Sequence, residues 1–215
     1  MTNRFLADLG KIDRGVLSIP ERINYDMFKS QLEDRRDSIQ FNEHLMPLNA
    51  DSGFHIGFAL LWQQMPFASA PEYDKYIARL RAFPKYVEEN MALMREGLRT
   101  GMTIPRAALP GVEMSIEPLI ADDPTKSPLW EPFAKPPATF DQATRDRVQR
   151  DGRAAIAEAV TPAYRTFLTF MTKEYLPGAR TTLGATALPN GQAYYAYLVR
   201  TFTRCTRVRS TTSKR

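Results

Sequence analysis

The sequence predicts an all-α fold, a multi-helix assembly with long kinked helices and a Pro-rich covering loop. Apolar residues recur at intervals of three and four over two long stretches, 71–99 and 142–176, and this spacing keeps one face of a helix apolar. Helix-start patterns precede several of the apolar stretches. An irregular segment dense in proline, 122–139, separates the two long stretches.

The composition is that of a globular protein. Of the 215 residues, 43% are hydrophobic and 25% are charged, which excludes disorder throughout the chain. No run approaches the roughly 18 to 20 apolar residues of a membrane helix, and residues 1–11 lack the apolar region of a signal peptide. We therefore expect no membrane span and, for the chain as written, a cytoplasmic location.

The positive charge is concentrated at the carboxyl end. The formal net charge is +5, and the residues after Thr203 contain no acid and five basic side chains, Arg204, Arg207, Arg209, Lys214 and Arg215. The rest of the chain is therefore neutral. Because residues 204–215 contain no aromatic side chain and no periodic face, we expect a basic disordered tail and no nucleic-acid partner. The alternative, nucleic-acid binding through the tail, predicts an affinity that falls steeply with salt.

The sequence offers few ligands for metal or redox chemistry. Cys205 is the single cysteine and has no partner for an internal disulfide, and His44 and His55 are the only histidines. Neither histidine is followed by Glu, so no ordinary zinc constellation can be assembled and we expect no cofactor in this chain. His55 stands beside Phe54, a setting more typical of a hydrogen-bonded core residue than of a ligand.

Two helices are expected at the amino end. The first covers 2–17, and the second starts at Ser18, whose spacing from Glu21 forms a capping box, and runs to about Asp37. The predicted buried stripe of the second helix consists of Ile23, Met27, Phe28, Gln31 and Leu32.

The next part of the chain contains one long helix between less regular segments. Residues 38–45 are ambiguous, and the apolar run 54–62 suits either a buried helix or a loop packed closely against its neighbours. The pattern 71–99 predicts a helix that is kinked or split at Pro84. A short helix is expected within 105–120, with a strand around 112–120 as a minor alternative.

The Pro-rich segment 122–139 is predicted to cover the helices, with Trp130 and Phe133 packed down on them. The helix 142–176 follows and is the element around which the chain is organised. Asp141 is its N-cap, and Pro177-Gly178 ends it.

Inside this helix, Pro162 removes a backbone hydrogen bond and crowds the carbonyl of Glu158, which predicts one bent rod in preference to two helices. A tight turn at 188–191 then leads into a last helix over 192–202. One side of that last helix is predicted to carry Tyr194, Tyr195, Leu198 and Val199, with Arg200 beyond them.

Several phrases along the chain resemble one bacterial family. They are Met94–Arg106, Pro162–Tyr164, Glu174–Arg180, Leu188–Tyr195 and Leu198–Thr203, and their joint order is far more specific than any one phrase. This order, over roughly residues 5–203, is similar to that of the family known as domain of unknown function 885.

Members of that family resemble helical zinc metallopeptidases of the carboxypeptidase Taq and angiotensin-converting-enzyme type. In their signature, H-E-x-x-P-G-H, two histidines hold zinc, the glutamate activates water, and a later glutamate is the usual third ligand. The signature is absent here, and in the family it belongs downstream of the phrase that ends at Thr203. The resemblance therefore implies that residues 1–203 are the helical amino-terminal portion of a metallopeptidase-like domain, without its catalytic half.

Residues 204–215 depart from the family pattern, which continues with a leucine-rich, acidic helix start. A frameshift or premature stop gives such an ending, and we expect this in preference to a genuine basic tail. An H-E-x-x-P-G-H motif in another frame downstream of codon 203 would support this expectation, and the lack of one would contradict it.

The implied function is that of a truncated metallopeptidase-like protein that supplies one wall of a substrate cleft and is inactive alone. A peptide is the implied substrate, and zinc is the cofactor of intact relatives, which are often envelope or periplasmic proteins. Tyr194, Tyr195 and Arg200 are the expected substrate-binding residues, because a tight turn delivers aromatic rings and a cation to one place. Alternatively, Tyr194 and Tyr195 are core residues with bonded hydroxyls.

The alternative function is a stand-alone helical binding module with no enzymatic activity. The two functions differ in the surface that they leave uncovered. A fragment exposes an apolar surface well beyond the roughly few hundred Å² that is typical of a monomer, and we expect it to self-associate through that surface. A module has no such surface.

Overall fold

The computed structural model describes residues 1–49 and 52–203. The chain divides into two compact units, one formed by residues 1–44 together with the segment from residue 184 onward, the other by residues 45–183. Both units are helical, and the described residues contain no strand, only an isolated bridge between Leu48 and Gly53. The all-α prediction is confirmed. The predicted basic tail, 204–215, lies outside the described residues.

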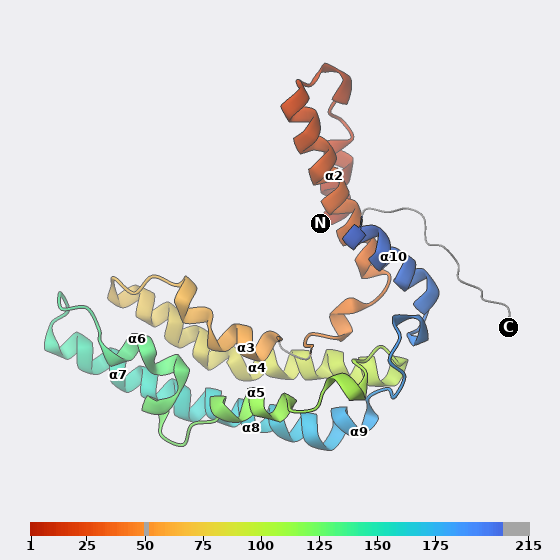
Figure 1. Cartoon of the computed structure of the whole chain (residues 1–215). Coiled ribbons are helices and arrows are strands. Elements are labelled where there is room, and N and C mark those ends of the chain that lie inside the picture. The colour runs from red at the N-terminus through yellow and green to blue at the C-terminus, as the bar shows by residue number, and fades with distance from the viewer. Residues whose placement is uncertain (50–51, 204–215) are drawn as a thin grey trace. The chain divides into compact units, whose positions relative to one another are not determined.

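Two long helical elements lie side by side in the larger unit (Figure 1). One is α4, which spans Ala70–Thr100. The other is a continuous rod made of α7 (Gln142–Ala155), a π-helical turn (Ile156–Val160), α8 (Thr161–Phe170), a second π-helical turn (Met171–Tyr175) and α9 (Leu176–Gly178). The rod confirms the long helix predicted over 142–176.

Each π-helical turn of the rod ends two residues before a proline. Pro162 and Pro177 are both the second residue of the α-helical segment that follows such a turn. A proline has no N–H to donate to the carbonyl four residues earlier, and the wider π turn lets the helix continue without that bond. The irregularity expected near Pro162 is therefore present, and a second one occurs at Pro177. Pro84 does not split α4.

Side chains at the starts of both long elements accept hydrogen bonds from backbone N–H groups. Asp141 accepts from the N–H of Thr144 at 2.7 Å, which confirms the predicted N-cap. Ser69 and Glu72 form a capping box at the start of α4, with the Glu72 carboxylate 2.9 Å from the Ser69 nitrogen. This second cap was not predicted, although the Ser-x-x-Glu spacing of a capping box is present at Ser69.

The α4 helix and the rod run in the same direction. Asp74 contacts Arg147, Phe83 contacts Tyr164, and Arg95 contacts Glu174, so residue numbers rise together on the two elements. At about 1.5 Å per residue, α4 is about 46 Å long, and the chain must travel back over this length before the rod can begin.

Residues 101–141 form the connection that runs back along α4 to the start of the rod. They contain α5 (Val112–Ile116), α6 (Glu131–Ala134) and short 3₁₀ turns at Arg106–Ala108, Glu117–Leu119, Pro124–Lys126 and Pro128–Trp130. The strand alternative around 112–120 is wrong, because residues 112–119 form α5 and the 3₁₀ turn that follows it. Trp130 and Phe133 are buried in the core, as predicted.

Four buried tyrosines attach the irregular segments to the two long elements. The Tyr73 hydroxyl donates to the Pro132 carbonyl at 2.9 Å, and the Tyr76 hydroxyl donates to the Leu129 carbonyl at 3.1 Å. On the rod, the Tyr164 hydroxyl donates to the His55 carbonyl at 2.8 Å. The Tyr175 hydroxyl accepts from the Ile104 N–H at 3.2 Å. These bonds tie backbone groups of the segments around α4 and the rod to the two long elements.

The remaining helix of the larger unit is α3, Phe54–Ala59, which a 3₁₀ turn at Leu61–Gln64 follows. The ring of Phe58 stacks on that of Phe83 of α4 at a centroid distance of 3.9 Å. The apolar run 54–62 is therefore helical, which was one of the two structures expected for it.

The smaller unit contains α1 (Thr2–Leu9), α2 (Ile19–Ile39) and α10 (Gly191–Thr203). The predicted capping box at Ser18 is present, since the Glu21 carboxylate accepts from the Ser18 N–H at 2.9 Å. The first helix ends earlier than predicted. A separate 3₁₀ turn at Arg14–Val16 follows it, capped by the Asp13 carboxylate, which accepts from the Gly15 N–H at 2.8 Å.

The predicted buried stripe of α2 is largely wrong. Leu32 is buried, but Ile23, Met27 and Phe28 are 55%, 58% and 46% exposed. The physical reason is a lack of covering elements within this unit, where only the short α1 lies along the amino-terminal part of α2 (Figure 1).

Among residues 1–49 and 52–203, no helix combines the length and the apolar character that crossing a bilayer requires.

Two helical glycines of the larger unit provide a matched test of the packing. A Cβ atom added at Gly152 of α7 lies 2.6 Å from the Phe133 ring, whereas one added at Gly57 of α3 meets nothing within 4 Å. We expect Gly152→Ala to lower the free energy of unfolding by about 1–2 kcal/mol, because overpacking outweighs the gain in helix propensity. Gly57→Ala should raise it by about 0.5 kcal/mol. Urea denaturation of both variants measures these changes, and equal effects would contradict the packing of Phe133 on α7.

Candidate functional site

The turn before α10 is built from residues that permit a close backbone approach. Asn190 has a positive φ of 54°, a conformation that asparagine tolerates better than most residues. A Cβ at Gly191 would lie 2.6 Å from the Ala185 carbonyl oxygen, so only glycine fits against the 3₁₀ turn Ala185–Ala187. The predicted tight turn at 188–191 is present and sets the start of α10.

One face of α10 packs on the carboxyl-terminal end of α2 and the residues just after it. Tyr194 and Tyr197 are both buried on this face, and their ring centroids lie 5.3 Å and 5.0 Å from that of Phe41. The two residues are three positions apart and therefore share one side of the helix. Within the smaller unit, this aromatic cluster packs α10 against the residues at the end of α2.

The tyrosine hydroxyls of this cluster are bonded to groups near the end of α2. Tyr194 donates to the Glu43 carboxylate at 3.0 Å, and Tyr197 donates to the Asp34 carbonyl at 3.1 Å. Burial, and then the hydrogen bond to Glu43, raise the pKa of the Tyr194 hydroxyl above its ordinary value. Tyr194 therefore stays protonated at neutral pH and acts as a hydrogen-bond donor.

Arg200 lies one turn beyond Tyr197 and forms an ion pair with α2. Its guanidinium donates to the Asp37 carboxylate at 2.6 Å and lies 5.7 Å from the centroid of the Tyr197 ring. Asp37 also accepts from Arg36 at 2.8 Å. Burial pushes the pKa of the Asp37 carboxyl upward, but the hydrogen bonds from the two arginines outweigh burial and hold it below the ordinary value.

A cavity of about 440 Å³ lies beside this ion pair, between α2 and α10. Its lining combines charged, aromatic and small side chains, namely Asp37, Gln40, Phe41, Ala193, Ala196, Tyr197 and Arg200. The cavity falls within the range of about 300–1,000 Å³ that is usual for ligand sites, and its polar groups converge from two helices. This arrangement can hold a small polar or peptide-like group.

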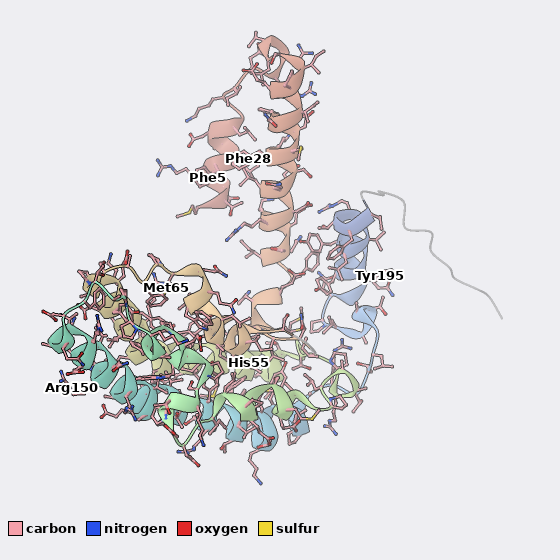
Figure 2. The ribbon with its side chains drawn as sticks, turned by 60° about the vertical axis from the view of Figure 1, so that its left-hand side comes forward. Phe5, Phe28, His55, Met65, Arg150 and Tyr195 are labelled. Atoms are coloured by element: carbon pink, nitrogen blue, oxygen red, sulfur yellow. The ribbon has the colours of Figure 1, made fainter. Side chains whose placement is uncertain are left out.

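The structure separates the three predicted substrate-binding residues. Tyr194 is buried under Glu43, and Arg200 lines the cavity. Tyr195 is 45% exposed and lies off the face that Tyr194 and Tyr197 share (Figure 2). Tyr194 has the bonded hydroxyl of the alternative interpretation, whereas Tyr195 and Arg200 are accessible to a ligand. Their role in substrate binding stays a prediction.

The residues that α2 and the segment just after it contribute to this site were not predicted. Tyr197 was within reach of sequence reasoning, because it is three residues from Tyr194 and so lies on the same helix face. Asp37, Phe41 and Glu43 lie more than 150 positions earlier in the chain, and no sequence pattern links them to α10. Their place in the site follows from packing alone.

His55, the other candidate that the sequence offered, is a buried residue of α3. Its Nε2 lies 2.9 Å from the Ser115 hydroxyl, and its Nδ1 has no hydrogen-bond partner among the described residues. Burial lowers the pKa of the imidazole from its ordinary value of about 6.5 to about 4. The ring is therefore neutral at pH 7, which fits the predicted core role (Figure 2).

Within the described part of the chain, no group of three or more His, Cys, Asp or Glu side chains is arranged to hold a metal ion.

Comparisons with known proteins identify the family. The profile of the family described as "Bacterial protein of unknown function (DUF885)" matches residues 1–210. The chain belongs to this family. A search of curated proteins gives no match to this DUF885 chain.

A solved structure supports the fold of this DUF885 chain. The putative lipoprotein from Colwellia psychrerythraea superposes with a TM-score of 0.68 at 18% sequence identity, over 76% of this chain. At this identity the likeness concerns the fold alone. The matched region is 28% of that lipoprotein chain, so the DUF885 chain described here spans well under half of the solved relative.

The pKa of His55 predicts a pH dependence of stability. Between about pH 6.5 and 4 the unfolded chain protonates His55 and the folded chain does not, so the free energy of unfolding falls as the pH drops through this range. We expect His55→Gln to reduce the slope of stability against pH in this window. Urea denaturation at pH 7.0, 5.5 and 4.5 tests this, and parallel curves for the two proteins would contradict it.

Proposed function

We propose that this chain supplies the helical wall of a substrate cleft in a larger metallopeptidase-like protein, and that the zinc-binding catalytic residues of that protein lie outside residues 1–203. Three findings support the proposal. The chain belongs to DUF885, its fold matches 28% of a longer solved chain, and its phrases resemble the amino-terminal part of proteins whose zinc motif lies downstream. Residues 204–215 are proposed to be an out-of-frame tail.

The observation that carries the proposal is a row of solvent-exposed apolar side chains along α2. Ile19, Ile23 and Met27 follow one another at intervals of four residues, so they lie on one side of the helix, and they are 75%, 55% and 58% exposed. Val16, just before α2, is 78% exposed. An exposed apolar stripe of this kind marks an interaction surface. It favours a portion that packs against further protein over the alternative of a stand-alone binding module, and it also supports self-association of the isolated chain.

The proposed substrate contact is the cavity beside Arg200. The Arg200 guanidinium donates to Asp37 and lies over the Tyr197 ring. Its other N–H groups can donate to a peptide carbonyl or carboxylate. Tyr195 adds an exposed aromatic ring on the same helix. Tyr194 acts indirectly in this proposal, because its bond to Glu43 positions α10.

The first prediction from this function concerns metal and activity. We expect the purified chain to bind less than a tenth of an equivalent of zinc, to cleave no peptide, and to keep its helical circular dichroism in the presence of a chelator, because no folding energy comes from a metal. Elemental analysis and a broad peptide-hydrolysis screen with and without chelator measure this. One equivalent of tightly held zinc together with chelator-sensitive cleavage would overturn the proposal.

A second prediction concerns the peptide contact. Arg200→Gln removes the cation from the cavity, and we expect it to weaken binding of a fluorescein-labelled random hexapeptide pool by about fivefold, the loss of one exposed charge-assisted hydrogen bond. Arg150→Gln is the matched control, since Arg150 is an exposed arginine of α7 in the other unit (Figure 2). Fluorescence anisotropy measures both variants. Equal loss in the two, or no binding by the unaltered chain, would remove Arg200 from the proposed site.

A further inference from the structure

The larger unit contains a second cavity, of about 400 Å³, between α3 and α4. Its walls are mainly aromatic, from Phe54 and Phe58 of α3 and from Phe83 and Tyr86 of α4. Its volume lies within the usual range of small-molecule sites, about 300–1,000 Å³. All of these residues belong to the unit formed by residues 45–183, so the cavity is separate from the site beside Arg200.

The aromatic walls are held in place by the core. Phe58 and Phe83 stack with their planes 20° apart at 3.9 Å, and Phe54 meets Tyr86 edge-on at 5.7 Å. Phe54 and Phe83 are buried members of the hydrophobic core. Because these rings are packed before any ligand arrives, a flat or slender apolar group can enter without the loss of side-chain entropy that ordering them would cost.

A glycine keeps this cavity open. Gly57 lies in the middle of α3, where glycine costs about 0.5–1 kcal/mol relative to alanine. A Cβ at this position would meet nothing within 4 Å, so neither the backbone conformation nor a close neighbour requires glycine here. What the missing side chain provides is space, because Gly57 lines the cavity.

One of the residues that line the cavity carries a charge. Arg79 of α4 lines it, and within the described residues its guanidinium donates to the sulfur of Met65 at 3.1 Å, a weak acceptor. Other arginines of this unit, such as Arg95 and Arg147, instead pair with carboxylates at 2.7 Å. The guanidinium of Arg79 therefore retains N–H groups that a carboxylate can accept from.

We propose that this cavity binds a small carboxylate that carries an aromatic ring or a short alkyl chain. The apolar group lies between the rings of Phe58 and Tyr86, above the space that Gly57 leaves, and the carboxylate pairs with Arg79. The carboxylate can belong to a free acid or to the carboxyl-terminal residue of a peptide, and the two sources share this chemistry. The proposal is independent of the cleft-wall function, since it uses other residues in the other unit.

The experiment compares 3-phenylpropanoate with its uncharged amide by isothermal titration calorimetry on the full chain. We expect the unaltered protein to bind the acid at least about fivefold more tightly than the amide, the contribution of one charge-assisted pair. Arg79→Gln should remove this preference. Arg81→Gln should keep it, because Arg81 is an exposed arginine of the same helix that does not line the cavity.

Gly57→Leu should fill the cavity and weaken binding of the acid by about tenfold or more, because the ligand and the new side chain compete for the same volume. Thermal melts establish that each variant is folded. A tripeptide ending in phenylalanine with a free carboxylate, against the same peptide as an amide, distinguishes the two sources: the peptide binding more tightly than the free acid assigns the site to peptide ends, and the reverse assigns it to free acids. Equal binding of acid and amide, no binding of either ligand pair, or unchanged binding by folded Gly57→Leu would overturn the proposal.

Discussion

Hydrogen bonds from buried tyrosines to backbone groups are the constraint on which the larger unit depends. The connecting segments carry polar backbone groups into a core that offers no water, and such groups are costly unless they are paired. Tyr73, Tyr76, Tyr164 and Tyr175 each contribute a large ring to the core and a hydroxyl to one of those backbone groups. The same residues thus provide hydrophobic burial and fix the path of the irregular chain.

The two candidate sites lie at different helix–helix contacts, one in each unit. Residues 101–141 return along the two helices, and α3 contacts both α4, through Phe58, and α5 of the returning segment, through the pair His55–Ser115. The apolar cavity at Gly57 lies at that α3–α4 contact. In the other unit, α10 reaches α2 through the aromatic cluster at Phe41, and the Arg200 cavity lies beside it. The two sites therefore differ in character, one nearly all aromatic and the other charged.

Much of the helical structure follows from local chemistry. Asp141 and Ser18 start helices because their side chains satisfy backbone N–H groups of the first turn, an interaction between residues three apart that sequence spacing reveals. The irregularities at Pro162 and Pro177 follow from the missing N–H of proline. Apolar spacing likewise predicted that residues 142–176 form one continuous element. Trp130 and Phe133 were predicted to pack inward because they are large aromatic side chains in the Pro-rich segment that covers the helices.

The sequence by itself thus determined the all-α class, the long helices and the membership in the DUF885 family. Only the tertiary structure decided that α4 and the rod are parallel, that Ile23 of α2 stays exposed, and that Tyr197 instead of Tyr195 faces Phe41. Helix periodicity shows that a face is apolar but contains no information on which distant element covers it. The partners of Arg200 and the cavity at Gly57 arise from contacts between segments far apart in the chain, and only the folded structure brings those segments together.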